Sequence, residues 1–368
     1  MACAQLAFYR GAAGPWALAR ARELVMRYGR NATCYQILNP GFSYWFSADG
    51  DAVVGFVPAG GYYVAAGEPV APAEARTRAA AEFAADSRQR GFGVLYVCAE
   101  PPFLEQLRAT NLPTAAVTIG AQPVWRPRQW AQMAAGNASL RSQIRRPARK
   151  GLIIESVDSG AAQRDPRLRR LLRQWLDRRH MPALHFLTEP QMLRGLVADR
   201  LVWVGSINGH PLAYLVASPV KLKNGYLIEQ IVRSPRAPNG AAEALVNAAM
   251  REIACRGCDF VSLGLVALSR QAAGMADNPP WVRALFTWAR AHGQRFYRFA
   301  GLENFRLKML PDHWEPLYLI SQEKTFGLPA LLAMAGAFSR RPLWQMGAAA
   351  GLVAVRQEVK NAGHWLRR

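Results

Sequence analysis

Two hydrophobic periods alternate along the first third of the chain. In residues 15–30 (PWALARARELVMRYGR) apolar side chains recur every three or four positions, which predicts an amphipathic helix. Short apolar runs punctuated by Gly, Asp and Pro follow, and they predict a meander of antiparallel strands at residues 42–47, 52–58 and 61–69. The pattern then predicts a helix, a strand, a helix and a strand, at residues 72–90, 93–100, 103–111 and 115–125.

The second half repeats this order of elements without a residue-level repeat. A helix is expected first, then three strands, a helix, a strand, a helix and a closing strand, at residues 166–180, 201–207, 211–218, 225–233, 240–256, 259–266, 281–293 and 314–321. We therefore predict an α+β fold in two lobes, with mixed, mostly antiparallel sheets flanked by helices. The predicted division is an N-terminal lobe, a basic connecting segment, a C-terminal lobe and a helical tail, at residues 1–138, 139–158, 159–322 and 323–368.

The tail has its own pattern of two apolar runs, residues 326–338 and 342–355, with Arg340 and Arg341 between them. Each run is shorter than the roughly 18 apolar residues that a membrane span needs. Trp365, Arg367 and Arg368 at the end of the chain would suit helices that lie in a membrane interface. The alternative is that both helices simply cover the core.

Charge changes this picture most. Lys and Arg number 46 against 25 Asp and Glu, a net charge of +21. Such a surplus favours a polyanionic partner, either nucleic acid or anionic lipid. The alternative is a proteome that simply favours arginine. No basic start followed by an apolar stretch marks a signal peptide, so a cytoplasmic protein is expected.

Five cysteines, Cys3, Cys34, Cys98, Cys255 and Cys258, are scattered without a framework, which fits a reducing compartment. Cys255 and Cys258 form a CxxC with no second pair to complete a zinc site. We therefore predict no metal site.

A turn with unusual chemistry lies between the strand at 225–233 and the helix that follows. It reads RSPRAPNG and supplies Arg233, Arg236, Asn239 and Gly240 just before the helix N-terminus. Free backbone N–H groups and the helix dipole attract anions there, and arginines add charge-assisted hydrogen bonds. The turn therefore predicts a phosphate site for a phosphorylated donor, with Gly240 admitting the phosphate closely. An ordinary strand–turn–helix with solvated arginines is the alternative.

Motifs spread along the chain resemble the catalytic C-terminal domain of the aminoacyl-phosphatidylglycerol synthases, the family of phosphatidylglycerol lysyltransferases. They are Ala237-Pro238-Asn239-Gly240, the SLGLVALS strand with Leu263-Gly264 and Leu268-Ser269, the run FAGLENFRLKMLPDHW, the basic stretch SLRSQIRRPARKGL and a strand ending in Ile119-Gly120. The resemblance covers residues 15–322.

This resemblance implies a tandem pair of acetyltransferase-like (GNAT-type) domains. The implied reaction moves an aminoacyl group from aminoacyl-tRNA to a lipid hydroxyl, with phosphatidylglycerol as the model acceptor and no further cofactor. Fuller family members carry a membrane flippase domain ahead of this unit. We therefore expect a soluble stand-alone form, peripheral on the inner face of the cytoplasmic membrane, with tRNA and anionic lipid as partners and room for a separate flippase.

Transesterification through an oxyanion calls for a cation near the carbonyl and a group that receives the acceptor proton. Arg306 and Lys308 are the predicted cations, and Glu229 is predicted to take the proton or to hold the donor ammonium. Ser269 is expected to touch the donor and His185 to line the acceptor pocket. Polyanion binding is predicted for the basic stretch, at Arg141, Arg145, Arg146, Arg149 and Lys150.

The sequence departs from the family pattern at three places. Val232 stands where the family carries an arginine, Arg306 replaces a lysine, and Arg145 replaces an asparagine. The amino acid and the lipid therefore stay open. Two other functions also stay open: an acyltransferase that uses a CoA thioester or an acyl carrier, and a non-catalytic binder of lipid or nucleic acid.

Overall fold

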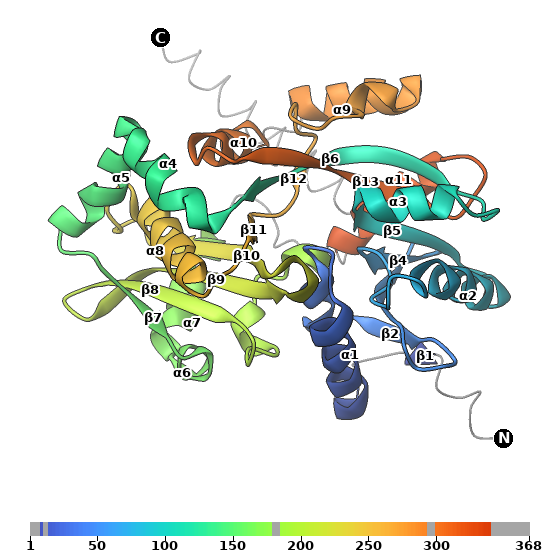
Figure 1. Ribbon diagram of the computed structural model, residues 1–368, viewed down its shortest axis with the longest axis horizontal. Helices are drawn as coiled ribbons and strands as arrows, with labels where there is room; N and C mark the ends of the chain where they lie inside the picture. Colours follow the sequence, from blue (N-terminus) through green and yellow to red (C-terminus); the bar gives the residue numbers. More distant parts are fainter. Residues whose placement is uncertain (1–7, 10–13, 179–184, 293–298, 340–368) are drawn as a thin grey trace, which may run out of the picture.

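The computed structural model describes residues 8–9, 14–178, 185–292 and 299–339, and their strands form one mixed sheet (Figure 1). The order across the sheet is β1-β2-β3-β4-β5-β13-β6-β11-β10-β9-β8-β7, and β12 pairs with β6. The first-half strands are β1 (Phe8–Tyr9), β2 (Ser43–Phe46), β3 (Val53–Ala59), β4 (Tyr62–Ala66), β5 (Gly93–Ala99) and β6 (Ala115–Trp125). The others are β7 (Ile153–Val157), β8 (Leu201–Ile207), β9 (His210–Val220), β10 (Gly225–Arg233), β11 (Phe260–Ser262), β12 (Val266–Ala267) and β13 (His313–Ser321).

Two strand pairs are parallel, β4 with β5 and β10 with β11, and all other pairs are antiparallel. A helix connects each parallel pair, α2 (Arg76–Gln89) in the first half and α8 (Ala241–Cys255) in the second. The predicted α+β class and the mixed, mostly antiparallel sheet are confirmed.

The last strand joins the two halves. β13 pairs with β5 on one side and with β6 on the other, so the end of the second half completes the sheet of the first. The proposed boundaries at residues 138 and 158 stay a prediction, because this sheet runs on through both halves.

Alternation along the strands fixes which helices cover which face. In β4, Val64 and Ala66 join a core with α1 (Pro15–Tyr28) and α11 (Leu328–Ser339). Tyr63 and Ala65 face a second core with α2 and α3 (Pro101–Arg108). Helices thus cover both faces of the first half.

The second half is layered in the same way. Ala213 and Leu215 of β9 pack with α8, and on the opposite face Tyr214 and Val216 pack with α6 (Ser159–Arg164) and α7 (Pro166–Asp177). Figure 1 shows α8 in front of the strands and α7 behind them. The α8 side also carries α4 (Trp130–Gly136) and α5 (Ala138–Arg149).

Helix α11 corresponds to the first apolar run of the tail, and it covers the core. Ala330, Leu331 and Ala333 are buried in the same core as Val64, whereas Leu328 and Leu332 are about half exposed, at 50% and 46%. The second run, 342–355, and the residues predicted as anchors, Arg340, Arg341, Trp365, Arg367 and Arg368, lie outside the described residues. Within the described ranges, no helix combines the length and the hydropathy that a bilayer crossing requires.

Short helices fill the remaining connections. They are α9 (Pro280–His292) and α10 (Phe299–Lys308), together with the 3-10 turns η1 (Cys34–Leu38), η2 (Pro127–Gln129), η3 (Phe186–Thr188), η4 (Met192–Arg194), η5 (Lys221–Lys223) and η6 (Met275–Asp277).

Candidate active site between β10, α8 and α10

The strand, turn and helix predicted from residues 225–256 are present as β10, residues 234–240 and α8. Gly240 is the N-cap of α8, and no side chain caps the first amides of this 15-residue helix. Arg233, Arg236 and Asn239 are exposed beside it. The N–H of Ala241 donates to the carbonyl oxygen of Pro238 at 3.1 Å. The other first-turn amides and the two guanidinium groups give this end of α8 a positive polarity, and the phosphate site stays a prediction.

Gly240 packs closely against α5, and its predicted phosphate contact stays a prediction. Its φ is +95°, and a Cβ at this position would lie 2.2 Å from the carbonyl oxygen of Gln143 and 3.2 Å from Cδ of Pro147. Helix α5 therefore occupies the Cβ side of Gly240. The glycine is needed so that α5 can pack against the start of α8.

Replacing Gly240 by alanine is expected to destabilise the fold by about 2–4 kcal/mol. Left-handed backbone costs a non-glycine residue roughly 1–2 kcal/mol, and the clash with Gln143 adds to that cost. Gly209→Ala is the matched control, because Gly209 has a φ of +72° but no neighbour within 4 Å. Urea unfolding of both variants measures the difference, and equal losses would show that α5 does not constrain Gly240.

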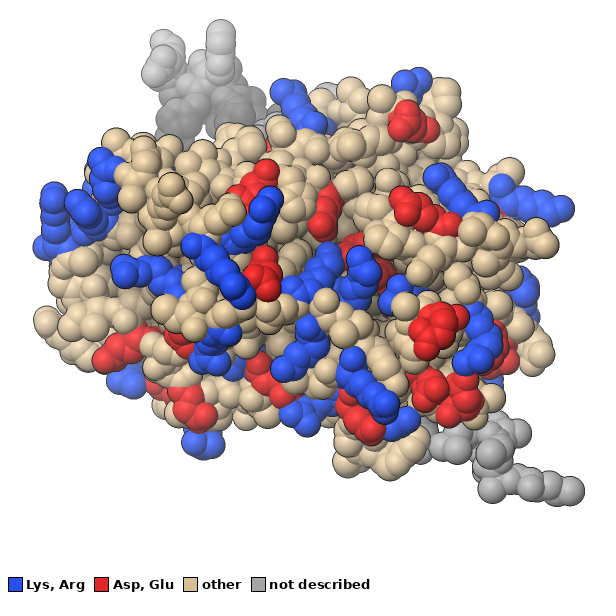
Figure 2. All heavy atoms as spheres, viewed as in Figure 1, with Lys and Arg blue, Asp and Glu red and all other residues tan. Residues whose placement is uncertain are grey.

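The predicted connecting segment contains a formed amphipathic helix. In α5 the side chain of Asn137 caps the N-terminus by accepting a hydrogen bond from the N–H of Leu140 at 2.8 Å. Leu140, Ile144 and Pro147 face α8. The outer side carries the predicted polyanion-binding residues, of which Arg145, Arg146, Arg149 and Lys150 are exposed and Arg141 is half-buried. Basic side chains gather over the α4–α5 end of the molecule (Figure 2).

The two predicted cations lie on α10 and reach the same region. Lys308 Nζ is 2.6 Å from Oε1 of Glu243, which stands in the first turn of α8, and about a third of the Lys308 side chain is exposed. The Nη2 of Arg306 donates to the carbonyl oxygen of Leu263 at 2.7 Å, just after β11. The structure thus brings Arg306, Lys308 and the polarised end of α8 together.

Ser269 is fully buried and is already engaged. Its hydroxyl donates to Oε1 of Glu303 at 2.7 Å, and the same oxygen accepts from the N–H of Arg270 at 2.8 Å. Arg290 Nη2 donates to the other carboxylate oxygen at 2.6 Å. Burial by itself would raise the pKa of Glu303, but the hydrogen bonds from Arg290 and Ser269 outweigh it and lower that pKa. Ser269 therefore fixes the loop before α9.

Glu229 lies where β10 and β11 separate. The two strands pair only over Gly225–Leu227, and the register of β10 shifts between Ile228 and Gln230, so Glu229 stands at a bulge. Its carboxylate is buried, 3.2 Å from Arg200 and 3.3 Å from Nε2 of Gln36.

Arg200 neutralises the carboxylate that we expected to hold a donor ammonium. Its guanidinium also donates to Oδ1 of Asn39 at 2.7 Å and to the carbonyl oxygen of Leu196 at 2.7 Å, and it lies 5.1 Å from the ring centre of Tyr35. The pair therefore connects the two halves of the protein.

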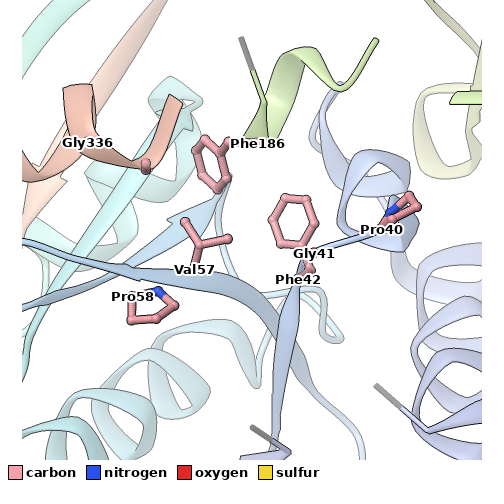
Figure 3. A pocket seen from close by; sticks show the side chains of 8 residues that line it. Pro40, Gly41, Phe42, Val57, Pro58, Phe186 and Gly336 are labelled. Atoms are coloured by element: carbon pink, nitrogen blue, oxygen red, sulfur yellow. The ribbon is translucent and has the colours of Figure 1, made fainter. Parts of the chain in front are cut away.

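His185 lies apart from these groups, at the edge of an apolar hollow. Its ring Nδ1 is 3.0 Å from Oε2 of Glu189, and its backbone N–H donates to the carbonyl oxygen of Phe338 at 2.8 Å. The following Phe186 lines the hollow of about 130 Å³ together with Phe42, Val57 and the glycines and prolines around them (Figure 3). His185 is thus next to a residue that lines the hollow, with its own ring paired with Glu189, and its role in an acceptor pocket stays a prediction.

Comparison with known proteins identifies the family. The family model described as "Phosphatidylglycerol lysyltransferase, C-terminal" matches residues 22–321. The chain belongs to this family. A search of curated proteins finds no match.

Solved structures share the fold of this phosphatidylglycerol lysyltransferase C-terminal domain. The C-terminal domain of a putative lysylphosphatidylglycerol synthetase from Agrobacterium fabrum has a TM-score of 0.72 and 23% identity, covering 88% of this chain and 96% of that one. L-PGS from Bacillus licheniformis has a TM-score of 0.69 and 19% identity, with 90% and 98% covered. FemX has a TM-score of 0.50 and 9% identity, with 84% and 87% covered.

Sequence reasoning missed a second buried network in this lysyltransferase-family domain. Lys223 Nζ lies 2.8 Å from Oε2 of Glu100 and 3.3 Å from Oε2 of Glu315, and Glu68 accepts from Asn31 at 2.6 Å. The only signal was that Glu68 and Glu100 stand within two residues of the ends of buried strands, β4 and β5. Arg200 was also missed, because nothing around it in the sequence shows that its partners are distant residues.

Glu68 gives the domain a pH-dependent stability. Burial, and then the charge of Glu100, raise the pKa of Glu68 to about 7, while Arg76 and the hydrogen bond from Asn31 act in the opposite direction. The folded state therefore binds this proton more tightly than the unfolded state, and Glu68 costs stability as pH rises toward and above 7. The backbone N–H of Glu100 donates to Oε2 of Glu68 at 3.5 Å, and the carboxylate of Glu100 in turn pairs with Lys223 at 2.8 Å.

Glu68→Gln is therefore expected to stabilise the protein by about 1–3 kcal/mol at pH 8. The gain should shrink as the pH falls through 7 toward 5, because Glu68 is then protonated in the folded protein. Urea unfolding at several pH values measures it, with the exposed Glu155→Gln on β7 as control. A gain that does not change between pH 5 and 8 would contradict this assignment.

Proposed function

We propose that this chain transfers an aminoacyl group from aminoacyl-tRNA to a hydroxyl of an anionic lipid of the phosphatidylglycerol type. The observation that carries the proposal is the family match over residues 22–321, a stretch that contains α5, the start of α8 and α10. The basic side of α5, the polarised end of α8 and the cations of α10 are therefore parts of one matched unit.

The donor side of the proposed site is the α5–α8 region. Gln143 touches Gly240, so the basic outer side of α5 adjoins the turn that carries Arg233 and Arg236. A row of guanidinium groups beside an uncapped helix end suits the phosphates of a tRNA acceptor stem. Binding there should weaken steeply with salt.

The chemistry assigned to the site is transesterification. The lipid hydroxyl attacks the ester carbonyl of the aminoacyl-tRNA, the new ester forms, and the bond to the terminal ribose oxygen breaks. The acceptor proton ends on that released ribose hydroxyl. We assign Lys308 to the oxyanion, with Arg306 holding the end of β11 beside it. Glu229 is already paired with Arg200, so we assign it to positioning the substrates and not to the proton transfer.

The acceptor side is proposed at the hollow beside His185. Its lining of Phe42, Val57 and Phe186 suits an acyl chain rather than a headgroup. We propose the inner face of the cytoplasmic membrane as the place of action, because aminoacyl-tRNA and membrane lipid meet there.

The test is a reconstituted assay with purified protein, lysyl-tRNA or alanyl-tRNA labelled in the amino acid, and phosphatidylglycerol vesicles. Label that enters the lipid extract supports the proposal. Product only from acyl-CoA would replace it with a CoA-dependent acyltransferase. Vesicle binding without product from any donor would replace it with a lipid-binding role.

A further inference from the structure

One face of the sheet carries three adjoining segments: α7, residues 185–197 and α11. Leu193 and Val197 share a core with Leu168 of α7. The ring of Phe186 lies 5.2 Å from the ring of Phe338 in α11. We call this side the α7–α11 face. In the second half it lies opposite the side that carries α8 and α5.

Helix α7 gives this face a strong positive charge. It has four arginines against one aspartate, Asp177. Its inner side is apolar, with Leu168 and Leu171 buried, whereas Arg169, Arg170 and Arg173 are exposed. Among the described residues none of these three forms an ion pair, so their charge is available to a partner.

Helix α11 gives the same face exposed apolar side chains. Leu328 and Leu332 are one turn apart, so they project from the same side of a helix that contains no charged residue. Trp281 at the start of α9 is 39% exposed and stacks on Phe326, just before α11, at 6.5 Å between ring centres. Leucine with tryptophan beside arginine is the composition of an interfacial membrane contact.

We propose that the α7–α11 face docks on an anionic phospholipid bilayer, with the α7 arginines on the headgroups and Leu328 and Leu332 in the interface. The inference rests on the proposed function, in that the acceptor is a membrane lipid. The apolar hollow is lined by Gly336 and Ala337 of α11, so a chain leaving the bilayer has a short path to it. Helix α5, on the other side of the sheet, stays free for tRNA.

Other occupants fit these side chains less well. A second copy of the chain would bring the same unpaired arginines together, which repel one another. RNA would use the arginines but would gain nothing from exposed leucines, since RNA recognition relies on stacking and hydrogen bonding.

The test is sedimentation of the full chain with vesicles of phosphatidylcholine, with and without phosphatidylglycerol. Replacing Arg169, Arg170 and Arg173 together by Gln should weaken binding to the anionic vesicles by about 100-fold, since each arginine near such a surface contributes about fivefold. Leu328→Ser with Leu332→Ser should weaken binding that persists at high salt. These side chains are exposed, so both variants should fold.

Two matched variants serve as controls. The first replaces Arg145, Arg146 and Arg149 of α5 by Gln and so removes the same charge from the other side of the sheet. The second, Leu222→Ser, removes a similarly exposed leucine (55%) from η5. Both should bind vesicles like the unchanged protein, and the α5 variant should lose tRNA binding instead.

The outcomes separate this inference from the proposed function. If the α7 and α11 variants lose vesicle binding but the unchanged protein shows no transfer from any donor, the docking face is supported. The proposed transferase function is then wrong. If the α7 variant binds vesicles and transfers the aminoacyl group to their lipid as well as the unchanged protein does, the docking face is wrong. The proposed transferase function then stands. Loss of tRNA binding in the α7 variant, or a dimer that the Leu328 and Leu332 changes dissociate, would also overturn it.

Discussion

Lys308→Ala should lower the turnover number of aminoacyl transfer by roughly 100- to 1,000-fold, the usual effect of removing one oxyanion-stabilising group. The Michaelis constant for tRNA should change little, because the lysine would act on the reacting carbonyl and the tRNA contacts would remain. Glu243, which loses its partner at 2.6 Å, stays in the first turn of α8, where the helix dipole favours a carboxylate. The variant should therefore fold.

Two further variants make this prediction specific. Lys324→Ala removes an exposed lysine after β13 and should leave turnover unchanged. Glu243→Gln keeps Lys308 but removes the carboxylate that holds it, and a moderate fall in turnover would mark Glu243 as a positioning residue. Activity of Lys308→Ala within threefold of the unchanged protein would remove Lys308 from the reaction.

Arg200→Met should destabilise the protein by about 3–5 kcal/mol, because it leaves the Glu229 carboxylate buried without its cation. Both side chains are fully buried, so water cannot replace the lost partner. Unfolding in urea gives the free energy directly. A loss below about 1 kcal/mol would show that Glu229 takes up a proton or reaches solvent instead.

The double variant Arg200→Met with Glu229→Leu separates the energy of the Arg200–Glu229 ion pair from the energy of their other contacts. Removing both charges should recover much of the loss, since apolar pairs often replace buried ion pairs without cost. If the losses of the single variants add, the two residues do not stabilise each other, and Arg200 acts mainly through Asn39 and Leu196.

The sequence predicted a helix or strand well where a short contiguous stretch of residues contains the whole pattern. The strand 225–233 is β10 with the same bounds, and the helix expected at 240–256 is α8 at 241–255, because an apolar run, a Pro- and Gly-containing turn and an alanine-rich stretch follow one another. Helix α5 was not predicted, since Pro147 stands inside it and its arginines suggested a connecting segment. Asn137 and the spacing of Leu140, Ile144 and Pro147 were the signal of a helix.

Long-range pairings had no such signal. Nothing near residues 313–321 shows that β13 lies between β5 and β6, because its partners are set by the rest of the sheet. Arg200 meets Glu229 at a separation of 29 residues, and Gln36 meets it at 193. For the same reason the sequence could not show that Gly240 also packs against Gln143 of a separate helix, and its phosphate contact stays a prediction.

Aminoacyl transfer to lipid is tested most directly by mass spectrometry of total lipids from cells with and without this protein. We expect a lipid that gains the mass of one aminoacyl residue when the protein is present, and we expect this product to disappear with Lys308→Ala at equal protein level. Lipids that are unchanged, with the folded protein present and charged tRNA available, would contradict aminoacyl transfer to lipid.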